Sequence, residues 1–150
     1  MYDYADMMGA EIFIAMQHYK IIGNVVVFVP DFDKKRGLHS KRIAQEFCRL
    51  SGLPMSDALI KTRKTSPQKF GGHNERIQNV HNAFSVTNKE DIKDKKVIII
   101  DDIRTSGATI NECARILKKN GAAMVIGLTF AGASENIQFE NSIEPNCDTN

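Results

Sequence analysis

The sequence predicts an α/β protein with a mostly parallel, doubly wound sheet. Three runs of apolar, mainly β-branched residues show no polar alternation, at positions 25–29, 97–100 and 124–130. Such runs are typical of strands that are buried on both faces, as in a parallel sheet. Segments in which apolar residues recur at helical spacing separate the runs. This alternation of strand and helix indicates βαβ units, whose crossovers are right-handed.

Length and composition favour one domain with a core of its own. The chain has 150 residues, of which 42% are hydrophobic and 25% charged, as is usual for a soluble globular protein. The net charge of +2 is too small to indicate a nucleic-acid-binding protein by itself. We expect a single α/β domain over residues 1–130 and a polar, disordered tail over residues 131–150.

The first half of the chain predicts helix, strand and helix. Residues 1–20 carry apolar side chains at helical spacing, and Gly23-Asn24 ends that helix. The run at 25–29 is the first buried strand, closed by Pro30. A second helix follows, ends at Gly52, and has an apolar face made of Ile43, Ala44, Phe47 and Cys48.

The middle of the chain predicts weaker elements around a long loop. Residues 58–62 are a short strand candidate, and the polar, basic stretch 61–72 predicts a loop that acts as a lid. Asn74 is the expected cap of a short helix, and residues 80–86 return to strand character. A lid would exclude water from a reactive intermediate.

A helix is predicted after the run at 97–100, and Asn120-Gly121 is its stop signal. Glu112 is expected off the apolar face of this helix. That face consists of Ile110, Cys113, Ala114 and Leu117.

Asp101 and Asp102 follow directly on the buried run 97–100. Ligands of open α/β sheets bind outside the carboxyl ends of the strands, so a site is expected here. Two adjacent carboxylates can accept hydrogen bonds from a vicinal diol and can hold a hydrated Mg²⁺ ion. The pair therefore predicts contact with sugar hydroxyls and a metal.

Small and hydroxylated residues form the loop after this acidic pair. Hydroxyl groups donate to anions, and small residues let backbone N–H groups approach a phosphate at the start of the next helix. A phosphate, a diol and a metal together describe a ribose phosphate. The expected phosphate-binding residues are Thr105, Ser106, Gly107, Ala108 and Thr109.

The stretch VIIIDDIRTSGAT, residues 97–109, resembles the phosphoribosyl pyrophosphate (PRPP) motif of the type I phosphoribosyltransferases. In that family the two acids contact the ribose hydroxyls and the loop holds the 5'-phosphate. The resemblance implies these roles for Asp101 and Asp102 and for residues 105–109.

Upstream segments are similar to the ComF-like branch of that family. These segments are RKTSPQ at 63–68 and ERIQNVHNAF at 75–84, together with Arg36-Gly37, after which Leu38, His39 and Ser40 depart from the branch's pattern. The cysteines that often bind zinc in this branch are absent. The short N-terminal segment also suggests that a base-selecting hood is missing.

The resemblance implies a Mg²⁺-dependent phosphoribosyltransferase. Pyrophosphate would be displaced from PRPP by a nitrogen nucleophile, either a base or ammonia. Asp101 and Asp102 would stabilise positive charge on the ribose, and Arg36 and Arg76 would neutralise the leaving group. The family commonly pairs subunits, which implies a homodimer.

A basic loop follows the first strand and opens on the same sheet edge. A pyrophosphate group needs cationic and N–H donors, and Lys35, Arg36 and Gly37 are suited to supply them. A merely solvated basic turn explains these residues equally well.

Other functions remain open at this stage. The acidic pair and Thr109 could simply cap local amides. The fold could bind PRPP or a nucleotide without catalysis, as an accessory protein in DNA uptake. Basic stretches at 34–36, 61–69 and 93–96 suit single-stranded nucleic acid, but no aromatic residue lies among these basic loops to stack on bases. The GxGxxG and Walker patterns are absent.

The three cysteines lack metal-binding spacing, which favours buried thiols in a reducing, cytoplasmic compartment. Cys48 and Cys113 lie on predicted apolar helix faces. His39, His73 and His81 share no ligand spacing and are expected as solvated loop residues. No apolar run approaches the roughly 20 residues of a membrane span.

Overall fold

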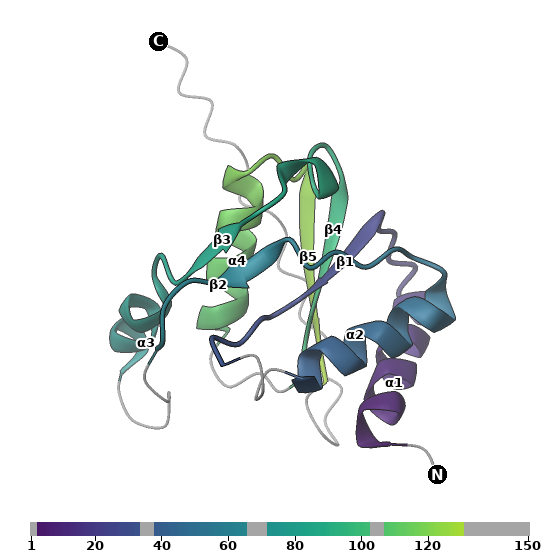
Figure 1. Ribbon diagram of the computed structural model, residues 1–150. Coiled ribbons are helices and arrows are strands. Elements are labelled where there is room, and N and C mark those ends of the chain that lie inside the picture. Colours follow the sequence, from purple (N-terminus) through teal and green to yellow (C-terminus); the bar gives the residue numbers. More distant parts are fainter. Residues whose placement is uncertain (1–2, 34–37, 66–71, 103–106, 131–150) are drawn as a thin grey trace.

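The computed structural model describes residues 3–33, 38–65, 72–102 and 107–130, with side chains omitted at 38 and 73. Four α-helices, five strands and one 3₁₀ turn lie within these ranges (Figure 1). In chain order they are α1 (Tyr4–His18), β1 (Val25–Phe28), α2 (Leu38–Ser51), β2 (Leu59–Lys61), α3 (His73–Val80), β3 (Phe84–Val86), η1 (Lys89–Asp91), β4 (Lys96–Asp101), α4 (Ala108–Lys119) and β5 (Met124–Thr129).

The central sheet is parallel and has the strand order β1-β4-β5. Val26 also forms a parallel bridge with Met55 at the outer side of β1. A separate antiparallel pair consists of β2 and β3. The prediction of a mostly parallel α/β sheet is confirmed, and the antiparallel pair is an addition that the sequence did not reveal.

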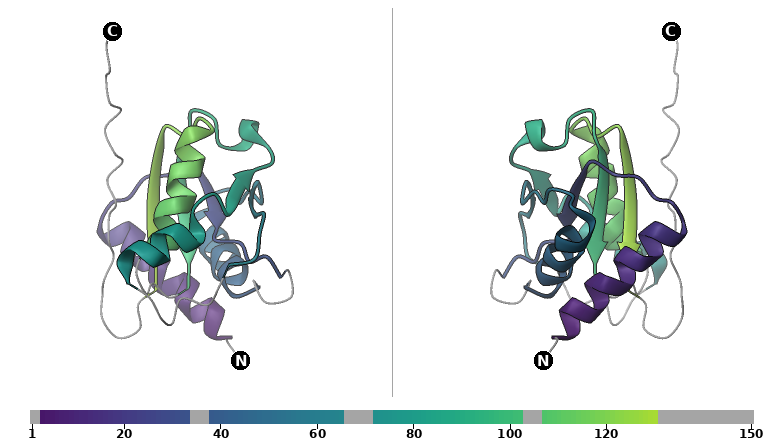
Figure 2. Two further views of the ribbon diagram at one scale, coloured as in Figure 1. Left: turned by 90° about the vertical axis from the view of Figure 1, so that its left-hand side faces the viewer. Right: turned by 90° about the vertical axis from the view of Figure 1, so that its right-hand side faces the viewer.

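Both faces of the sheet are covered, as a doubly wound fold requires (Figure 2). Alternate strand residues point to opposite faces, so β1 and β4 supply two separate cores. Val27 and Ile99 belong to the core shared with α4 and the β2-β3 pair. Val26 and Ile98 belong to the core shared with α1 and α2.

The helix α4 lies close to β5 because Gly127 has no side chain. A Cβ atom at this position would lie 2.8 Å from Cγ2 of Ile110 in α4. This distance is shorter than real Cβ contacts allow, so with any other residue here Ile110 or the helix that carries it would have to shift.

Most predicted elements agree with the structure, and the middle of the chain needs correction. The helix α3 begins at His73 with Gly72 as its N-cap, so the predicted capping role of Asn74 is wrong. Val80 belongs to α3, and the following strand is confined to Phe84–Val86. His39 and His73 lie in helices, not in loops.

Candidate functional site

Asp101 and Asp102 lie at the carboxyl edge of the sheet, between two neighbouring strands. Asp101 pairs in register with Thr129 of β5, and Phe130 donates its backbone N–H to the carbonyl oxygen of Asp102 at 3.1 Å. On the other side, Val29 donates its N–H to the carbonyl of Ile100 at 2.9 Å. The backbone of the acidic pair is therefore fixed by the sheet itself.

The Asp101 carboxylate accepts two hydrogen bonds but faces a like charge. Ser40 in the first turn of α2 donates its hydroxyl to Oδ1 at 3.0 Å, and the Asp102 N–H donates to the same oxygen at 2.9 Å. Burial first, and then the Asp102 charge, raise the pKa of Asp101 to about 7. The hydrogen bond from Ser40 opposes this rise. A cation between the two carboxylates would relieve their repulsion.

The amino end of α4 begins five residues after Asp102. Gly107 is its N-cap and adopts the left-handed conformation, with φ of 74°. Glycine has no side chain with which to cap this end, and it takes the left-handed conformation at little cost. Ala108 is buried and Thr109 is partly buried. The helix thus directs the positive end of its dipole toward the sheet edge that carries the acidic pair.

Most of the remaining predicted site residues cannot be placed, and Arg76 is the exception. Lys35, Arg36, Gly37, Thr105 and Ser106 lie outside the described residues. So does part of the predicted lid, residues 66–71, and the whole tail at 131–150.

Arg76 lies in α3, the helix that packs beside α4. Its side chain is partly buried, and its Nε atom is buried without a hydrogen-bond partner among the described residues. The structure does not place Arg76 against the acidic pair.

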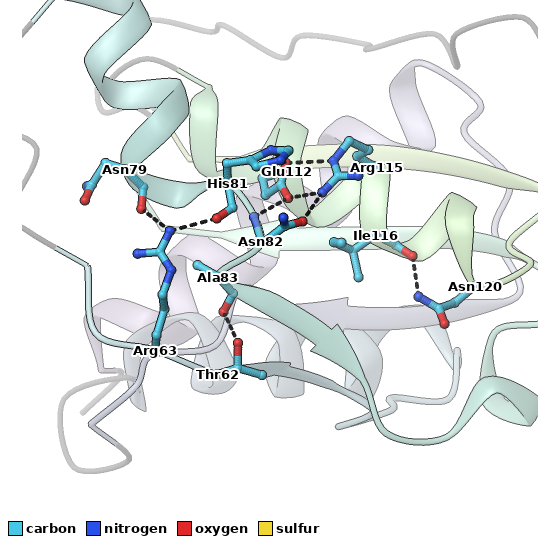
Figure 3. A network of polar contacts seen from close by, with 10 residues as sticks. All are labelled: Thr62, Arg63, Asn79, His81, Asn82, Ala83, Glu112, Arg115, Ile116 and Asn120. Carbon is cyan, nitrogen blue, oxygen red and sulfur yellow. Dashed lines mark hydrogen bonds and ion pairs between the residues drawn. The ribbon is translucent and has the colours of Figure 1, made fainter.

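A network of polar contacts around Asn82 joins α4 to the turn between α3 and β3 (Figure 3). Glu112 accepts the Asn82 backbone N–H at 2.9 Å, and Arg115 donates to Glu112 at 2.6 Å and to the Asn82 side-chain oxygen at 2.8 Å. Asn82 has a positive φ of 56°, so these contacts hold a turn that asparagine tolerates better than most residues.

Glu112 is only 7% exposed, so the prediction that it lies off the buried face of its helix is wrong. Its hydrogen bonds explain the burial, because a buried carboxylate is stable where a cation and an N–H group satisfy it. Although burial opposes the change, the bonds from Arg115 and Asn82 hold the pKa of Glu112 below its usual value. His81 follows the end of α3 and is exposed, as predicted, and its Nδ1 atom lies 3.8 Å from the Glu112 carboxylate.

Arg63 and Thr62 hold the same turn from the opposite side. Arg63 donates to the carbonyl oxygens of Asn79 and His81 at 2.8 and 2.7 Å, and Thr62 donates to that of Ala83 at 3.1 Å. Arg63, quoted above for the family resemblance, therefore has a structural role at the end of α3.

The acidic pair is the one predicted metal site within the described ranges. No three His, Cys, Asp or Glu side chains gather there as a ready metal cage. Cys113 is buried and Cys48 partly buried, both as free thiols, and burial raises the pKa of each. Two carboxylates with a helix amino end beside them suit Mg²⁺ that is held jointly with a phosphorylated ligand. Among the described helices, none combines the length and apolarity needed to cross a bilayer.

Fold and site together define a parallel α/β protein with an acidic pair and a helix amino end at one sheet edge. The family model of the phosphoribosyl transferase domain matches residues 38–149, so the chain belongs to that family. Partial matches to two curated relatives support the ComF-like branch of the type I family, as predicted.

These relatives match the chain in part. It is 37% identical over 70 residues to the DNA utilization protein YhgH of Escherichia coli K12, covering 47% of this chain and 30% of that protein. It is 32% identical over 81 residues to competence protein F of Haemophilus influenzae, covering 53% and 35%. The chain thus matches about a third of the length of each relative.

A solved structure with the same fold is the glutamine PRPP amidotransferase of B. subtilis, complexed with ADP and GMP. The TM-score is 0.58 at 21% identity, covering 83% of this chain and 25% of that one. At this identity the likeness establishes the fold alone, and it agrees with the fold class predicted above.

Proposed function

We propose that this protein is a Mg²⁺-dependent phosphoribosyltransferase that uses PRPP. A nitrogen nucleophile, a base or ammonia, would displace pyrophosphate from the anomeric carbon of the ribose. The observation that carries the proposal is the adjacent pair Asp101-Asp102 at the end of β4, on the sheet edge where α4 begins after a left-handed glycine.

The described residues suit three tasks in this reaction. Asp101 and Asp102 would accept hydrogen bonds from the 2'- and 3'-hydroxyls and stabilise positive charge on the ribose ring. Gly107, Ala108 and Thr109 would hold the 5'-phosphate with the amides of the first helical turn.

We extend these roles to residues outside the described ranges. Thr105 and Ser106 would complete the 5'-phosphate loop, and Lys35, Arg36 and Gly37 would hold the pyrophosphate group. Arg76 is a further candidate for neutralising that group, because its buried Nε has no hydrogen-bond partner among the described residues. Catalysis of this kind depends on position and charge, so no protein nucleophile is needed.

Mg²⁺ fits the donor set at this edge. The ion binds through one or two carboxylates together with substrate phosphates, and the like-charged acidic pair offers that arrangement. Bound there, Mg²⁺ would neutralise charge on the departing pyrophosphate. Asp101 and Asp102 would hold it directly or through water.

The comparisons support PRPP as the donor substrate and leave the acceptor unidentified. A protein with the same fold is named for PRPP, and the family model is named for phosphoribosyl transfer. Nothing in these names identifies the nucleophile that this chain would use. We also propose a cytoplasmic, paired protein whose catalytic domain spans residues 1–130.

A second function is favoured by the names of the curated relatives, a DNA utilization protein and a competence protein. A protein of this kind could bind PRPP or a nucleotide without turning it over. Pyrophosphate release in the presence of a base would favour the enzyme, whereas salt-sensitive binding of an oligonucleotide would favour the accessory role.

Calorimetric titration of PRPP with Mg²⁺ tests the proposal. We expect the wild type to bind and the double variant Asp101→Asn, Asp102→Asn to lose at least roughly 100-fold in affinity, because each carboxylate contributes charge-assisted hydrogen bonds. The matched control is Asp57→Asn, which changes an exposed aspartate. Absence of Mg²⁺-dependent binding in the wild type would refute the proposal.

A further inference from the structure

Ser40 continues the buried face of α2 to the edge of the sheet. It is followed at helical spacing by three fully buried apolar residues of the same helix, Ile43, Ala44 and Phe47. These three belong to the core that contains Ile100, the residue before the acidic pair. Ser40 is itself only 7% exposed, so its hydroxyl group lies where this core reaches the end of β4.

One oxygen of the Asp101 carboxylate is fully used inside the protein. Oδ1 accepts the Ser40 hydroxyl at 3.0 Å and the Asp102 N–H at 2.9 Å. A carboxylate oxygen has two lone-pair directions, so these two donors occupy Oδ1. Among the described residues, no N–H or alcohol group donates to Oδ2. Asp101 can therefore offer a bound ligand one oxygen rather than two.

The two donors hold Oδ1 in different ways. The Asp102 N–H belongs to the next residue of the chain and stays beside Asp101 wherever that segment goes. The Ser40 hydroxyl comes from a residue 61 positions away, on a helix that the core fixes against β4. Removing this hydroxyl would free one lone-pair direction of Oδ1, and the carboxylate could then turn both oxygens toward a ligand.

The number of oxygens that a carboxylate offers distinguishes Mg²⁺ from Ca²⁺. Mg²⁺ requires octahedral coordination, and the two oxygens of one carboxylate lie too close together to fill two corners of an octahedron. Ca²⁺ is larger, takes six to eight oxygens, and often binds both oxygens of a carboxylate. A carboxylate that presents one oxygen therefore favours Mg²⁺.

We propose that Ser40 is a positioning residue that limits Asp101 to one-oxygen contact with the metal, and that the site prefers Mg²⁺ to Ca²⁺ for this reason. This inference rests on the proposed function, since it concerns the same acidic pair. Residues 38–40 depart from the ComF-like pattern, so the family resemblance assigns Ser40 no role.

Ser56 is a matched control for Ser40. It is also 7% exposed, and it donates its hydroxyl to an aspartate, Asp91, at 2.7 Å from Oδ2. Asp91 lies in η1, before the amino end of β4, whereas Asp101 lies at the carboxyl end of that strand. The two serines thus make the same kind of hydrogen bond, and only one of them is at the proposed site.

Calorimetric titration of PRPP with Mg²⁺ and, separately, with Ca²⁺ measures the preference as the ratio of the two dissociation constants. We expect the wild type to have the smaller Kd with Mg²⁺. In Ser40→Ala, Kd with Mg²⁺ should rise about two- to five-fold, as for the loss of one hydrogen bond, and Kd with Ca²⁺ should stay the same or fall. Ser40→Thr keeps the hydroxyl group and should restore the wild-type ratio. Ser56→Ala should leave that ratio unchanged.

The outcomes separate this inference from the proposed function. If the wild type binds PRPP with Mg²⁺ but Ser40→Ala keeps the wild-type ratio, or if the wild type prefers Ca²⁺, the inference alone is overturned. If Ser40→Ala weakens binding equally with both ions, Ser40 supports the site in general and its assignment to metal preference is wrong. If the wild type binds PRPP with neither ion, both proposals fail.

Amide hydrogen exchange in the wild type covers the case in which Ser40→Ala does not fold. The Asp102 N–H donates to Oδ1, so its exchange should be as slow or slower when PRPP and Mg²⁺ are added. Faster exchange of this amide would show that the ligand takes Oδ1 from its donors, and it would overturn the inference.

Discussion

Asp101 and Glu112 are two carboxylates in one small region whose settings are opposite. Asp101 has the like charge of Asp102 beside it, and its pKa is raised to about 7. Glu112 accepts hydrogen bonds from Arg115 and from the Asn82 N–H, and its pKa is lowered. Glu112 is therefore paired with a cation inside the protein, whereas Asp101 has no cationic partner among the described residues. The setting of Glu112 is typical of a structural group, and the setting of Asp101 is typical of a binding group.

The largest effect on stability should come from replacing Glu112, the carboxylate that is paired inside the protein. We expect Glu112→Ala to lower the free energy of unfolding by about 2 to 4 kcal/mol, because it leaves the Asn82 N–H and the Arg115 guanidinium without their acceptor. Denaturant unfolding followed by circular dichroism would measure the loss. Glu11→Ala, an exposed helical glutamate, is the control and should change stability by less than about 0.5 kcal/mol.

The pH dependence of this effect has a definite sign. The folded pKa of Glu112 lies below its unfolded value, so its ionised form stabilises the protein at neutral pH. The stability difference between wild type and Glu112→Gln should therefore shrink as the pH falls through the lowered pKa of Glu112. A constant difference down to acid pH would contradict the assigned network.

Replacing Asp101 should change the free energy of unfolding in the opposite direction. We expect Asp101→Asn to raise the free energy of unfolding by about 1 to 3 kcal/mol at pH 8 without Mg²⁺, because it removes a carboxylate that the fold disfavours in its charged form. The folded pKa is the higher one, so the gain should be complete above pH 7 and vanish near pH 4. Thermal unfolding in a chelating buffer measures it, and a less stable variant at pH 8 would contradict the comparison.

A smaller effect should follow at the far side of the Asn82 turn. Arg63→Ala removes two hydrogen bonds to carbonyl oxygens at the end of α3, so we expect a loss of about 1 kcal/mol. Hydrogen exchange should show the change mainly in the amides of α3. Lys64→Ala serves as the control, and equal exchange rates in both variants would show that Arg63 does not hold the turn.

Ser40→Ala should have the smallest effect. The variant loses one hydrogen bond to Asp101, which favours the charged carboxylate, so the pKa of Asp101 should rise further. We expect PRPP affinity to fall about two- to five-fold and stability to change by less than about 1 kcal/mol. A carbon-13 NMR titration of the Asp101 carboxyl would measure the pKa directly, and a lower value than in the wild type would contradict this account.

The fold was largely predictable because the three parallel strands are apolar on both faces. Residues 97–100, for example, are all fully buried, and their sequence shows no polar position. The β2-β3 pair was less predictable, since each strand has only three residues. Val80 was misassigned because an apolar residue at the end of a short helix looks the same in sequence as one that begins a strand.

The site was predictable only where the chemistry lies in neighbouring residues. Asp101, Asp102 and Gly107 lie close together in one motif at a strand end, so the sequence alone could single them out as candidates. Glu112 was placed wrongly because its partner Asn82 lies 30 positions away and a polar residue in a helix normally faces solvent. Ser40 depends on a tertiary neighbour in the same way, since its partner Asp101 lies 61 positions away.

Gly127 contacts no proposed ligand, yet it limits which substitutions the protein tolerates. A side chain at that position would meet Ile110 in the first turn of α4, close to Gly107, so Ile110 or α4 would have to shift. Gly72 has nothing within 4 Å of its would-be Cβ and a φ of −70°, so other residues fit there. A survey of tolerated substitutions should thus find position 127 as closed to change as the acidic pair and position 72 open.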